Sequence, residues 1–254
     1  MSDSPLTFQD KVILITGAST GMGRATALAL GKQGAKVVLG DLSDAAGHTA
    51  DEINTAGGTA IFVKTNVADA DSVAALVDAA VTTYGRLDGA FNNAGLLPQT
   101  AALADQTVEE FDKTIAVDLR GVFLSLKYEI TAMLKTGGGS IVNTASVAGV
   151  VADPGMSPYA AAKHGVIGLT QAAALDYATQ GIRINAIAPG LVATPMTKRW
   201  LDDPEKHAAL LANSPIGRPA EPEEIAGTVL HLLSDAASFT TGATMLVDGG
   251  QTAH

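Results

Sequence analysis

The sequence predicts an α/β fold, a single doubly wound domain of seven mainly parallel strands flanked by helices. The chain has 254 residues, a length that suits one domain of roughly 250 residues. Seven short, nearly continuous apolar runs have the composition of strands that are buried on both faces. Longer alanine-rich stretches with helical spacing separate these runs, and strands joined through helices form the right-handed units of a parallel sheet.

The predicted elements alternate along the chain without a linker or a low-complexity segment. We expect strands at 12–16, 36–40, 60–64, 87–91, 140–144, 182–187 and 244–247. Helices are expected at 23–33, 44–56, 71–84, 108–135, 159–179 and 223–233. Thr107 and Glu110 have the spacing of a capping box, and Pro222 suits a first helical turn. One long irregular stretch, at about 190–219, follows the sixth strand and is a candidate substrate lid within the single domain 1–254.

Composition excludes several classes of function. The chain lacks cysteine, which rules out disulfides, thiolate metal sites and cysteine nucleophiles. It carries 16 Lys and Arg residues against 26 Asp and Glu residues, a balance that argues against a nucleic-acid partner. No long apolar run predicts a membrane span, and the polar start lacks the features of a signal peptide, so we expect a cytoplasmic protein. The five histidines show no metal-ligand spacing, so no catalytic metal is expected.

A glycine-rich turn follows the first predicted strand and opens the first helix. It reads Thr16-Gly17-Ala18-Ser19-Thr20-Gly21-Met22-Gly23, a G-x-x-x-G-x-G spacing rather than G-x-G-x-x-G. Glycines make such a turn tight, bring backbone amides close to a pyrophosphate and let the helix approach the sheet. Because this turn lies between a strand and a helix, it indicates a dinucleotide site of the Rossmann type.

Asp41 ends the second predicted strand, 18 residues beyond Gly23. A carboxylate there can accept hydrogen bonds from an adenosine ribose and would repel a 2′-phosphate. No basic residue adjoins Thr20 or Leu42 to compensate, so the sequence favours NAD over NADP. The alternative is that Asp41 begins a turn or caps the next helix.

Tyr159 and Lys163 stand four residues apart on a predicted helix, so they lie on one face about 5–6 Å apart. A lysine cation favours the phenolate and lowers the pKa of a phenol from about 10. Such a tyrosine can exchange a proton with an alcohol near neutral pH. Ser146, 13 residues before Tyr159, can hold a substrate oxygen, although serine is also ordinary in a turn after a strand.

Taken in order, these motifs make the chain resemble the short-chain dehydrogenases/reductases over nearly its whole length. The matching segments are the glycine turn, the NNAG segment Asn92–Gly95, the Ser146/Tyr159/Lys163 set, Pro189-Gly190 with Thr194, and the C-terminal Asp248-Gly249-Gly250. The resemblance implies an NAD-dependent alcohol dehydrogenase or ketone reductase that transfers a hydride reversibly between the cofactor and a secondary alcohol or ketone. It also implies a homotetramer.

The resemblance further assigns roles to single residues. Tyr159 would be the acid and base, Ser146 would orient the substrate oxygen, and Lys163 would bind the nicotinamide ribose and depress the pKa of the tyrosine. The implied cofactor contacts are Gly17, Ser19, Thr20, Gly21, Met22, Gly23, Asp41, Leu42, Asn66, Val67, Asn93, Ala94, Gly95, Tyr159, Lys163, Pro189, Gly190, Val192 and Thr194.

Asp118 departs from the family pattern. The family commonly carries asparagine in a V-N-L segment, where it completes a tetrad and a water-mediated proton relay; here the segment is Val117-Asp118-Leu119. Aspartate keeps an acceptor but loses the amide donors and adds a charge. We count Asp118 among the catalytic residues and expect it to offset part of the Lys163 charge, which would raise the kinetic pKa of Tyr159. The alternative is that this position tolerates aspartate without mechanistic consequence.

The predicted substrate wall is largely apolar, which suits a neutral alcohol or ketone. It comprises Ser146, Val147, Met156, Tyr159, Leu191, Met196 and Trp200, together with Leu96 and Leu97. The stretches 91–94, 127–128 and 234–239 resemble relatives that act on cyclic alcohols and diols, which favours an alicyclic secondary alcohol. Two rival functions stay open: a β-ketoacyl-thioester reductase that uses NADPH, and a protein that senses NAD without turnover.

Overall fold

Seven strands form one sheet in the order β3-β2-β1-β4-β5-β6-β7, and every neighbouring pair is parallel. This is seen in a computed structural model that describes residues 7–253. The strands are β1 (Val12–Thr16), β2 (Lys36–Asp41), β3 (Thr59–Lys64), β4 (Gly89–Asn92), β5 (Gly139–Thr144), β6 (Ile182–Pro189) and β7 (Thr244–Val247). The predicted doubly wound parallel sheet is confirmed, and the strand order reverses between β1 and β4.

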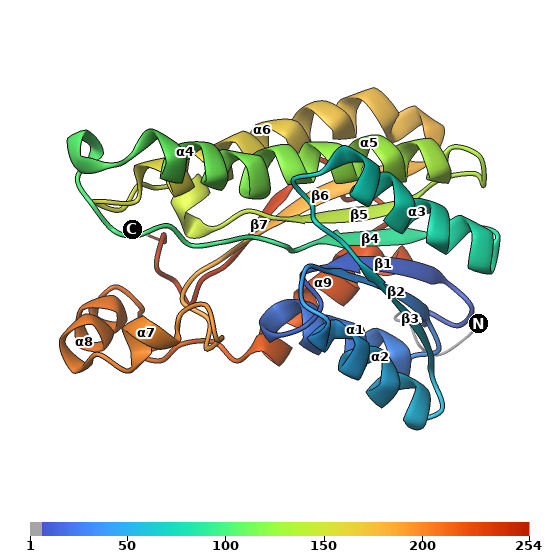
Figure 1. Cartoon of the computed structure of the whole chain (residues 1–254), viewed down its shortest axis with the longest axis horizontal. Coiled ribbons are helices and arrows are strands. Elements are labelled where there is room, and N and C mark those ends of the chain that lie inside the picture. The colour runs from blue at the N-terminus through green and yellow to red at the C-terminus, as the bar shows by residue number, and fades with distance from the viewer. Residues whose placement is uncertain (1–6, 254) are drawn as a thin grey trace.

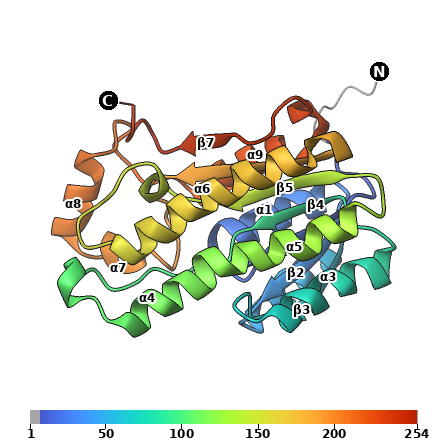
Figure 2. The ribbon, with the colours of Figure 1, turned by 90° about the horizontal axis from the view of Figure 1, so that it is seen from above.

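Helices cover both faces of the sheet (Figure 1). One face carries α1 (Gly21–Lys32), α2 (Ala45–Thr55) and α9 (Pro222–Leu233). The other carries α3 (Ala70–Tyr84), α4 (Val108–Ile115), α5 (Gly121–Met133) and α6 (Ser157–Tyr177), and α5 and α6 run side by side along it (Figure 2). No helix within residues 7–253 is both long enough and apolar enough to cross a membrane.

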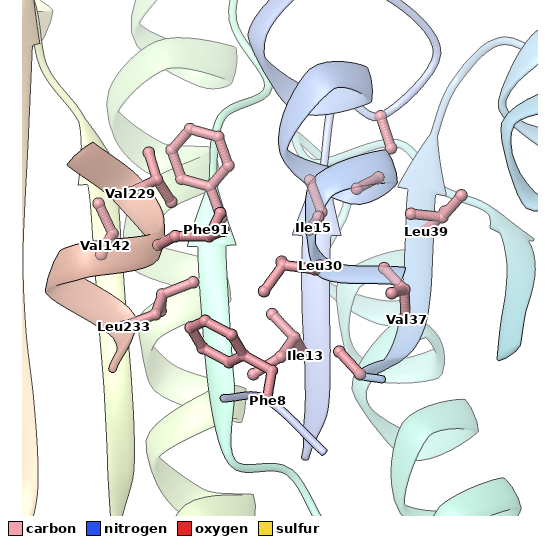
Figure 3. Packing of buried hydrophobic residues seen from close by; sticks show 14 of the residues in the cluster. Phe8, Ile13, Ile15, Leu30, Val37, Leu39, Phe91, Val142, Val229 and Leu233 are labelled. Atoms are coloured by element: carbon pink, nitrogen blue, oxygen red, sulfur yellow. The ribbon is translucent and has the colours of Figure 1, made fainter. Parts of the chain in front are cut away.

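Alternate residues of β1 pack into opposite layers. Ile13 and Ile15 share a cluster with Leu30 of α1 and Val229 of α9 (Figure 3), whereas Leu14 belongs to the cluster on the other face of the sheet. Successive side chains of a strand point to opposite faces, so a strand covered by helices on both sides must be apolar throughout. This is why the central strands appear in the sequence as continuous apolar runs.

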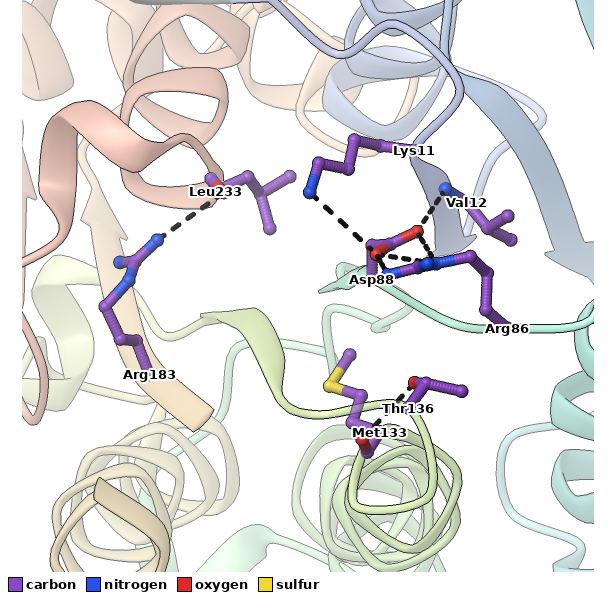
Figure 4. Close-up of polar contacts among 8 residues, drawn as sticks. All are labelled: Lys11, Val12, Arg86, Asp88, Met133, Thr136, Arg183 and Leu233. Carbon is purple, nitrogen blue, oxygen red and sulfur yellow. Dashed lines mark hydrogen bonds and ion pairs between the residues drawn. The ribbon is translucent and has the colours of Figure 1, made fainter. Parts of the chain in front are cut away.

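Polar contacts fix the amino ends of the strands (Figure 4). Asp88, just before β4, accepts a hydrogen bond from the backbone N–H of Val12 at 2.9 Å and pairs with Arg86 at 2.5 Å. Arg183 of β6 donates to the carbonyl oxygens of Leu233, at 3.5 Å, and Ser234, at 2.9 Å, where α9 ends. The glycine turn and Ser146 lie at the opposite, carboxyl ends of the strands, where ligands bind to open α/β sheets.

The segment expected to be an irregular loop contains two short helices, α7 (Lys198–Leu201) and α8 (Pro204–Ala212). Asp203 begins α8 by accepting hydrogen bonds from the backbone N–H groups of Glu205 and Lys206. Helices this short show too little periodicity to stand out in a sequence. The expectation of an irregular stretch is therefore wrong, while the role of this segment as a substrate lid stays a prediction.

The long helix predicted at 108–135 is interrupted by a π-helical turn, η2 (Ala116–Arg120), between α4 and α5. Its start also differs from the prediction. The Thr107 hydroxyl accepts a hydrogen bond from the Glu110 N–H at 3.1 Å, as expected, but the Glu110 carboxylate accepts one from the N–H of Gln99. The reciprocal half of the predicted capping box is therefore wrong, because Glu110 serves the preceding loop instead.

Candidate active site

The turn between β1 and α1 requires its glycines. Gly17 and Gly21 have positive φ angles of 68° and 54°. A Cβ atom on Gly23 would lie 2.1 Å from the carbonyl oxygen of Gly17, so only glycine fits there. Asn93, just after β4, donates from Nδ2 to the same Gly17 oxygen at 3.0 Å, and the Thr16 hydroxyl accepts a hydrogen bond from the Asn93 N–H at 3.0 Å. These hydrogen bonds from the end of β4 therefore fix the shape of the turn.

This turn forms one wall of a cavity of about 380 Å³, which we call the glycine-turn cavity. Thirteen predicted cofactor contacts line it: Gly17, Ser19, Thr20, Gly21, Met22, Asp41, Leu42, Asn66, Val67, Asn93, Ala94, Gly95 and Thr194. Gly23 does not line it and acts instead in packing the turn against the helix. Gly40, Thr65, Lys113 and Val117 also line it, although no sequence motif marks them, and Leu96 lies here rather than on the substrate wall.

Asp41 presents its carboxylate at the edge of the glycine-turn cavity. Oδ2 accepts a hydrogen bond from the Ser19 N–H at 2.9 Å, and Oδ1 accepts one from the Ser43 N–H at 2.8 Å. Each carboxylate oxygen retains a further lone pair for a ligand hydroxyl. Arg24, the cation next to the glycine turn in the sequence, pairs with Glu52 on α2. Asp41 thus acts both as a turn residue and as an acceptor at the cavity.

A second cavity of about 390 Å³, the tyrosine cavity, opens beside the first. Eight of the nine residues predicted for the substrate wall line it: Leu97, Ser146, Val147, Met156, Tyr159, Leu191, Met196 and Trp200. Pro189, Gly190 and Val192 line it as well. The two cavities share Met22, Thr194 and Met196. A ligand can therefore extend from the glycine turn to the tyrosine, as a dinucleotide would.

Tyr159 and Lys163 lie on one face of α6, which begins with Pro158 in its first turn. The ammonium nitrogen of Lys163 is 5.3 Å from the centre of the Tyr159 ring and donates a hydrogen bond to the carbonyl oxygen of Thr144 at 3.0 Å. Lys163 is 3% exposed, so its charge acts in a poorly solvated place. Ser146 follows β5, and its hydroxyl accepts a hydrogen bond from the Ala148 N–H at 3.2 Å. The structure thus brings Ser146, Tyr159 and Lys163, three of the four predicted catalytic residues, together.

The pKa of Tyr159 differs from the sequence prediction. Burial raises this pKa above the ordinary value of 10, and it outweighs the lowering effects of the Lys163 cation and the Ser146 hydroxyl. The Asp118 carboxylate raises the pKa further. The effect of Lys163 has the predicted direction, but the net shift is upward rather than downward, because burial penalises the phenolate.

Asp118 is fully buried within the π-helical turn η2. Its Oδ1 accepts a hydrogen bond from the Leu96 N–H at 2.8 Å, while Oδ2 has no partner among the residues that the structure describes. Burial raises the pKa of Asp118, and Lys163 and the Leu96 N–H oppose that shift. A Cβ on Gly95 would come within 3.0 Å of Asp118 Oδ1, so Gly95 keeps room for this carboxylate. Turns of the π type often occur at functional sites.

The donors and the space at this site fit a dinucleotide. The glycines form a cradle that side chains would fill: a Cβ on Gly21 would lie 3.0 Å from Thr194 Cγ2, and one on Gly17 would lie 2.8 Å from Ala94 Cα. Asn93 Oδ1 is buried without a partner in the described part of the chain. By contrast, no group of three or more His, Asp or Glu side chains among residues 7–253 could hold a metal ion.

Comparison with known proteins gives consistent matches along the chain. A family model described as enoyl-(acyl carrier protein) reductase matches residues 17–252. Cyclohexanol dehydrogenase from Acinetobacter sp. (strain SE19) is 47% identical over 246 residues, which cover 96% of each chain. A 2,5-dichloro-2,5-cyclohexadiene-1,4-diol dehydrogenase from Sphingobium indicum is 45% identical, over 96% of this chain and 97% of the relative. The crystal structure of levodione reductase superposes with a TM-score of 0.92 at 42% identity, over 97% of this chain and 99% of that one.

Proposed function

Because the chain belongs to the short-chain dehydrogenase/reductase family, we propose that it transfers a hydride between NAD(H) and a secondary alcohol or ketone whose reacting carbon lies in a ring. The observation that carries the proposal is the meeting of Ser146, Tyr159 and Lys163 beside a cavity that is continuous with the glycine turn. Relatives named for cyclohexanol and for a cyclohexadiene diol support the ring, and the apolar walls of the tyrosine cavity suit its carbon atoms.

In alcohol oxidation, Tyr159 Oη takes the proton of the substrate hydroxyl, and in ketone reduction it returns that proton. Ser146 Oγ donates a hydrogen bond to the substrate oxygen and fixes its distance from the phenol. The Lys163 ammonium group stabilises the phenolate, which offsets part of the cost of burial. When bound, the nicotinamide ring supplies the hydride acceptor or donor, and Thr194, Pro189, Gly190 and Val192 would lie beside it.

We propose NAD rather than NADP because of the charge at Asp41. A carboxylate at the adenosine end binds ribose hydroxyls and repels a 2′-phosphate. Arg24 is engaged by Glu52 and is not available to offset that charge. Lys113, on α4, is the cation that lines the glycine-turn cavity among the described residues. Lys113 comes from α4 and Asp41 from β2, and we expect this one lysine not to replace a basic residue next to Asp41 in the chain.

We also propose that four copies assemble. A shallow, mainly apolar groove crosses α4, η2, α5 and α6, and it is lined by Ile115, Leu119, Arg120, Phe123, Gly165, Gly168, Leu169 and Ala172. Phe123 is 49% exposed, although a phenylalanine in a helix is ordinarily buried. A second set of exposed apolar side chains comprises Leu246, on the edge strand β7, and Phe239, which precedes that strand. Two such faces are what a tetramer of dihedral symmetry needs.

The first experiment measures nicotinamide absorbance with NAD and NADP separately, against cyclohexanol, cyclopentanol and acyclic secondary alcohols. We expect turnover with NAD, and at least about a hundredfold loss in Tyr159→Phe, because phenylalanine cannot carry the proton. Tyr177→Phe, at the far end of α6, is the matched control and retains activity. Preference for NADP with thioester substrates would favour a β-ketoacyl-thioester reductase, and NADH binding without any turnover would favour a sensor.

A further inference from the structure

Gln251, on the C-terminal tail, lines the tyrosine cavity together with Ser146 and Tyr159. Its Oε1 lies against the turn that follows β6, since a Cβ atom on Gly190 would be 3.2 Å away from it. Ser146 follows β5 and Tyr159 lies on α6, so Gln251 approaches the cavity from a different element than the catalytic residues do.

Asp248 holds this tail in a defined turn. Its carboxylate accepts hydrogen bonds from the backbone N–H of Gly250 at 3.0 Å, the N–H of Thr252 at 2.9 Å and the Thr252 hydroxyl at 2.7 Å. The Gln251 N–H donates to the carbonyl oxygen of Asp248 at 3.2 Å. Because the backbone is fixed on both sides of Gln251, the side chain is positioned before a substrate arrives.

The side-chain amide of Gln251 makes no hydrogen bond with any group of residues 7–253, and it faces a cavity whose walls are mainly apolar. An amide offers two donors and one acceptor oxygen. The charged residues that line the cavity, Asp153 and Lys206, are exposed and opposite in sign, so together they give no preference for an ionised substituent. The polar group that matches Gln251 is therefore a neutral oxygen.

Building on the proposed function, we infer that Gln251 determines specificity by binding a second hydroxyl or carbonyl oxygen that the ring substrate carries away from its reacting carbon. A site that hydrogen-bonds a substrate oxygen discriminates against the analogue that lacks it, because its polar group is then left unpaired. On this inference, the substrate is a ring diol, hydroxyketone or dione rather than a simple ring alcohol.

The test compares cyclohexanol with cyclohexane-1,2-, 1,3- and 1,4-diol in the wild type, Gln251→Leu and Gln180→Leu. The last variant makes the same exchange at an exposed residue near the end of α6. We measure kcat/KM with NAD, and we measure binding from the fluorescence of Trp200, the single tryptophan, in the presence of NADH, where an alcohol binds without reacting. We expect the wild type to prefer one diol and Gln251→Leu to lower that diol-to-cyclohexanol ratio about five- to tenfold. Gln180→Leu keeps the ratio.

A wild type without diol preference, or a preference that survives in Gln251→Leu, overturns the role of Gln251 while leaving the dehydrogenase intact. If no alcohol turns over, the proposed function fails; the binding titration then decides separately whether Gln251 recognises the second oxygen. Loss of the binding preference in Gln251→Leu supports that recognition even without turnover. Equal binding of diol and cyclohexanol rejects it.

Discussion

Asp118 places a buried carboxylate beside Tyr159 and Lys163. It lies in the one π-helical turn of the described chain, accepts a hydrogen bond from the Leu96 N–H and faces the charge of Lys163. Its negative charge disfavours the Tyr159 phenolate, in opposition to Lys163. Burial gives the main upward shift in the pKa of the Tyr159 phenol, and these two buried charges of opposite sign adjust it.

We predict that Asp118→Asn shifts the pH–rate profile of alcohol oxidation to lower pH. Removing the carboxylate charge lowers the pKa of Tyr159, so the phenolate forms at a lower pH. Asparagine keeps an oxygen for the Leu96 N–H, so the turn is preserved. The measurement is kcat/KM between pH 6 and 10, with Asp112→Asn, an exposed residue on α4, as the matched control. An unchanged profile in Asp118→Asn would mean that Asp118 has no part in tuning the tyrosine.

For single residues, the sequence could predict which side chains lie close together, but not how their surroundings shift their pKa values. Tyr159, Lys163 and Ser146 were identifiable because helix spacing and strand ends place them. The upward shift in the pKa of Tyr159 depends on burial by side chains from distant segments, which no local pattern reports. Gln251 gave no sequence signal at all, since a polar residue near a terminus is ordinarily solvated.

Between the elements, a chain of buried polar groups links α5, β4, β5 and α6. Asn92 Nδ2 donates to Glu129 Oε2 and to Asn143 Oδ1, each at 3.0 Å, and Asn143 Nδ2 donates to the Thr170 hydroxyl at 2.9 Å. Glu129 Oε1 has no partner among the described residues. Burial raises the pKa of Glu129 to about 7, and the hydrogen bond from Asn92 only partly opposes this. Asn92 adjoins Asn93, which braces the glycine turn.

We predict that Glu129→Gln removes a pH-dependent loss of stability. The folded pKa of about 7 exceeds the ordinary value of 4.5, so the folded state holds the proton more tightly. The free energy of unfolding of the wild type then falls as pH rises from about 4.5 to about 7, and levels off above, by about 3 kcal/mol in total.

The measurement is urea unfolding at pH 5, 6, 7 and 8, taken as the difference between Glu129→Gln and the wild type. This difference cancels the titration of other groups, and we expect it to grow in favour of the variant up to about pH 7. Glu109→Gln, at an exposed position on α4, controls for the loss of one carboxylate. A difference that is constant with pH would show that Glu129 titrates normally.

At the scale of the whole molecule, alternation of apolar runs and helices was sufficient to predict a parallel sheet. It did not specify where the strand order reverses, because that depends on which strand lies beside β1. β4 takes that place and pairs Phe91 with Ile15. The reversal aligns the glycine turn with the end of β4, and so creates the glycine-turn cavity. Long-range pairing of this kind leaves little trace in the local composition of either segment.

Assembly is tested at Gly168, in the apolar groove across α5 and α6. A Cβ atom at this position meets nothing within 4 Å, so Gly168→Glu fits the single chain without a clash, whereas one on Gly165 would lie 2.8 Å from Leu119. If this groove is covered by a second copy, the new carboxylate is taken out of water there. Arg120, the cation that lines the groove, already donates to the carbonyl oxygen of Ala68, so the burial costs several kcal/mol. We therefore expect the wild type to elute as a tetramer and Gly168→Glu as a smaller folded species, with unchanged far-UV circular dichroism. Thr83→Glu, on the exposed side of α3, keeps the size of the wild type. If Gly168→Glu elutes at the same size as the wild type, this groove is not a subunit interface. The sheet edge at β7 then becomes the candidate interface.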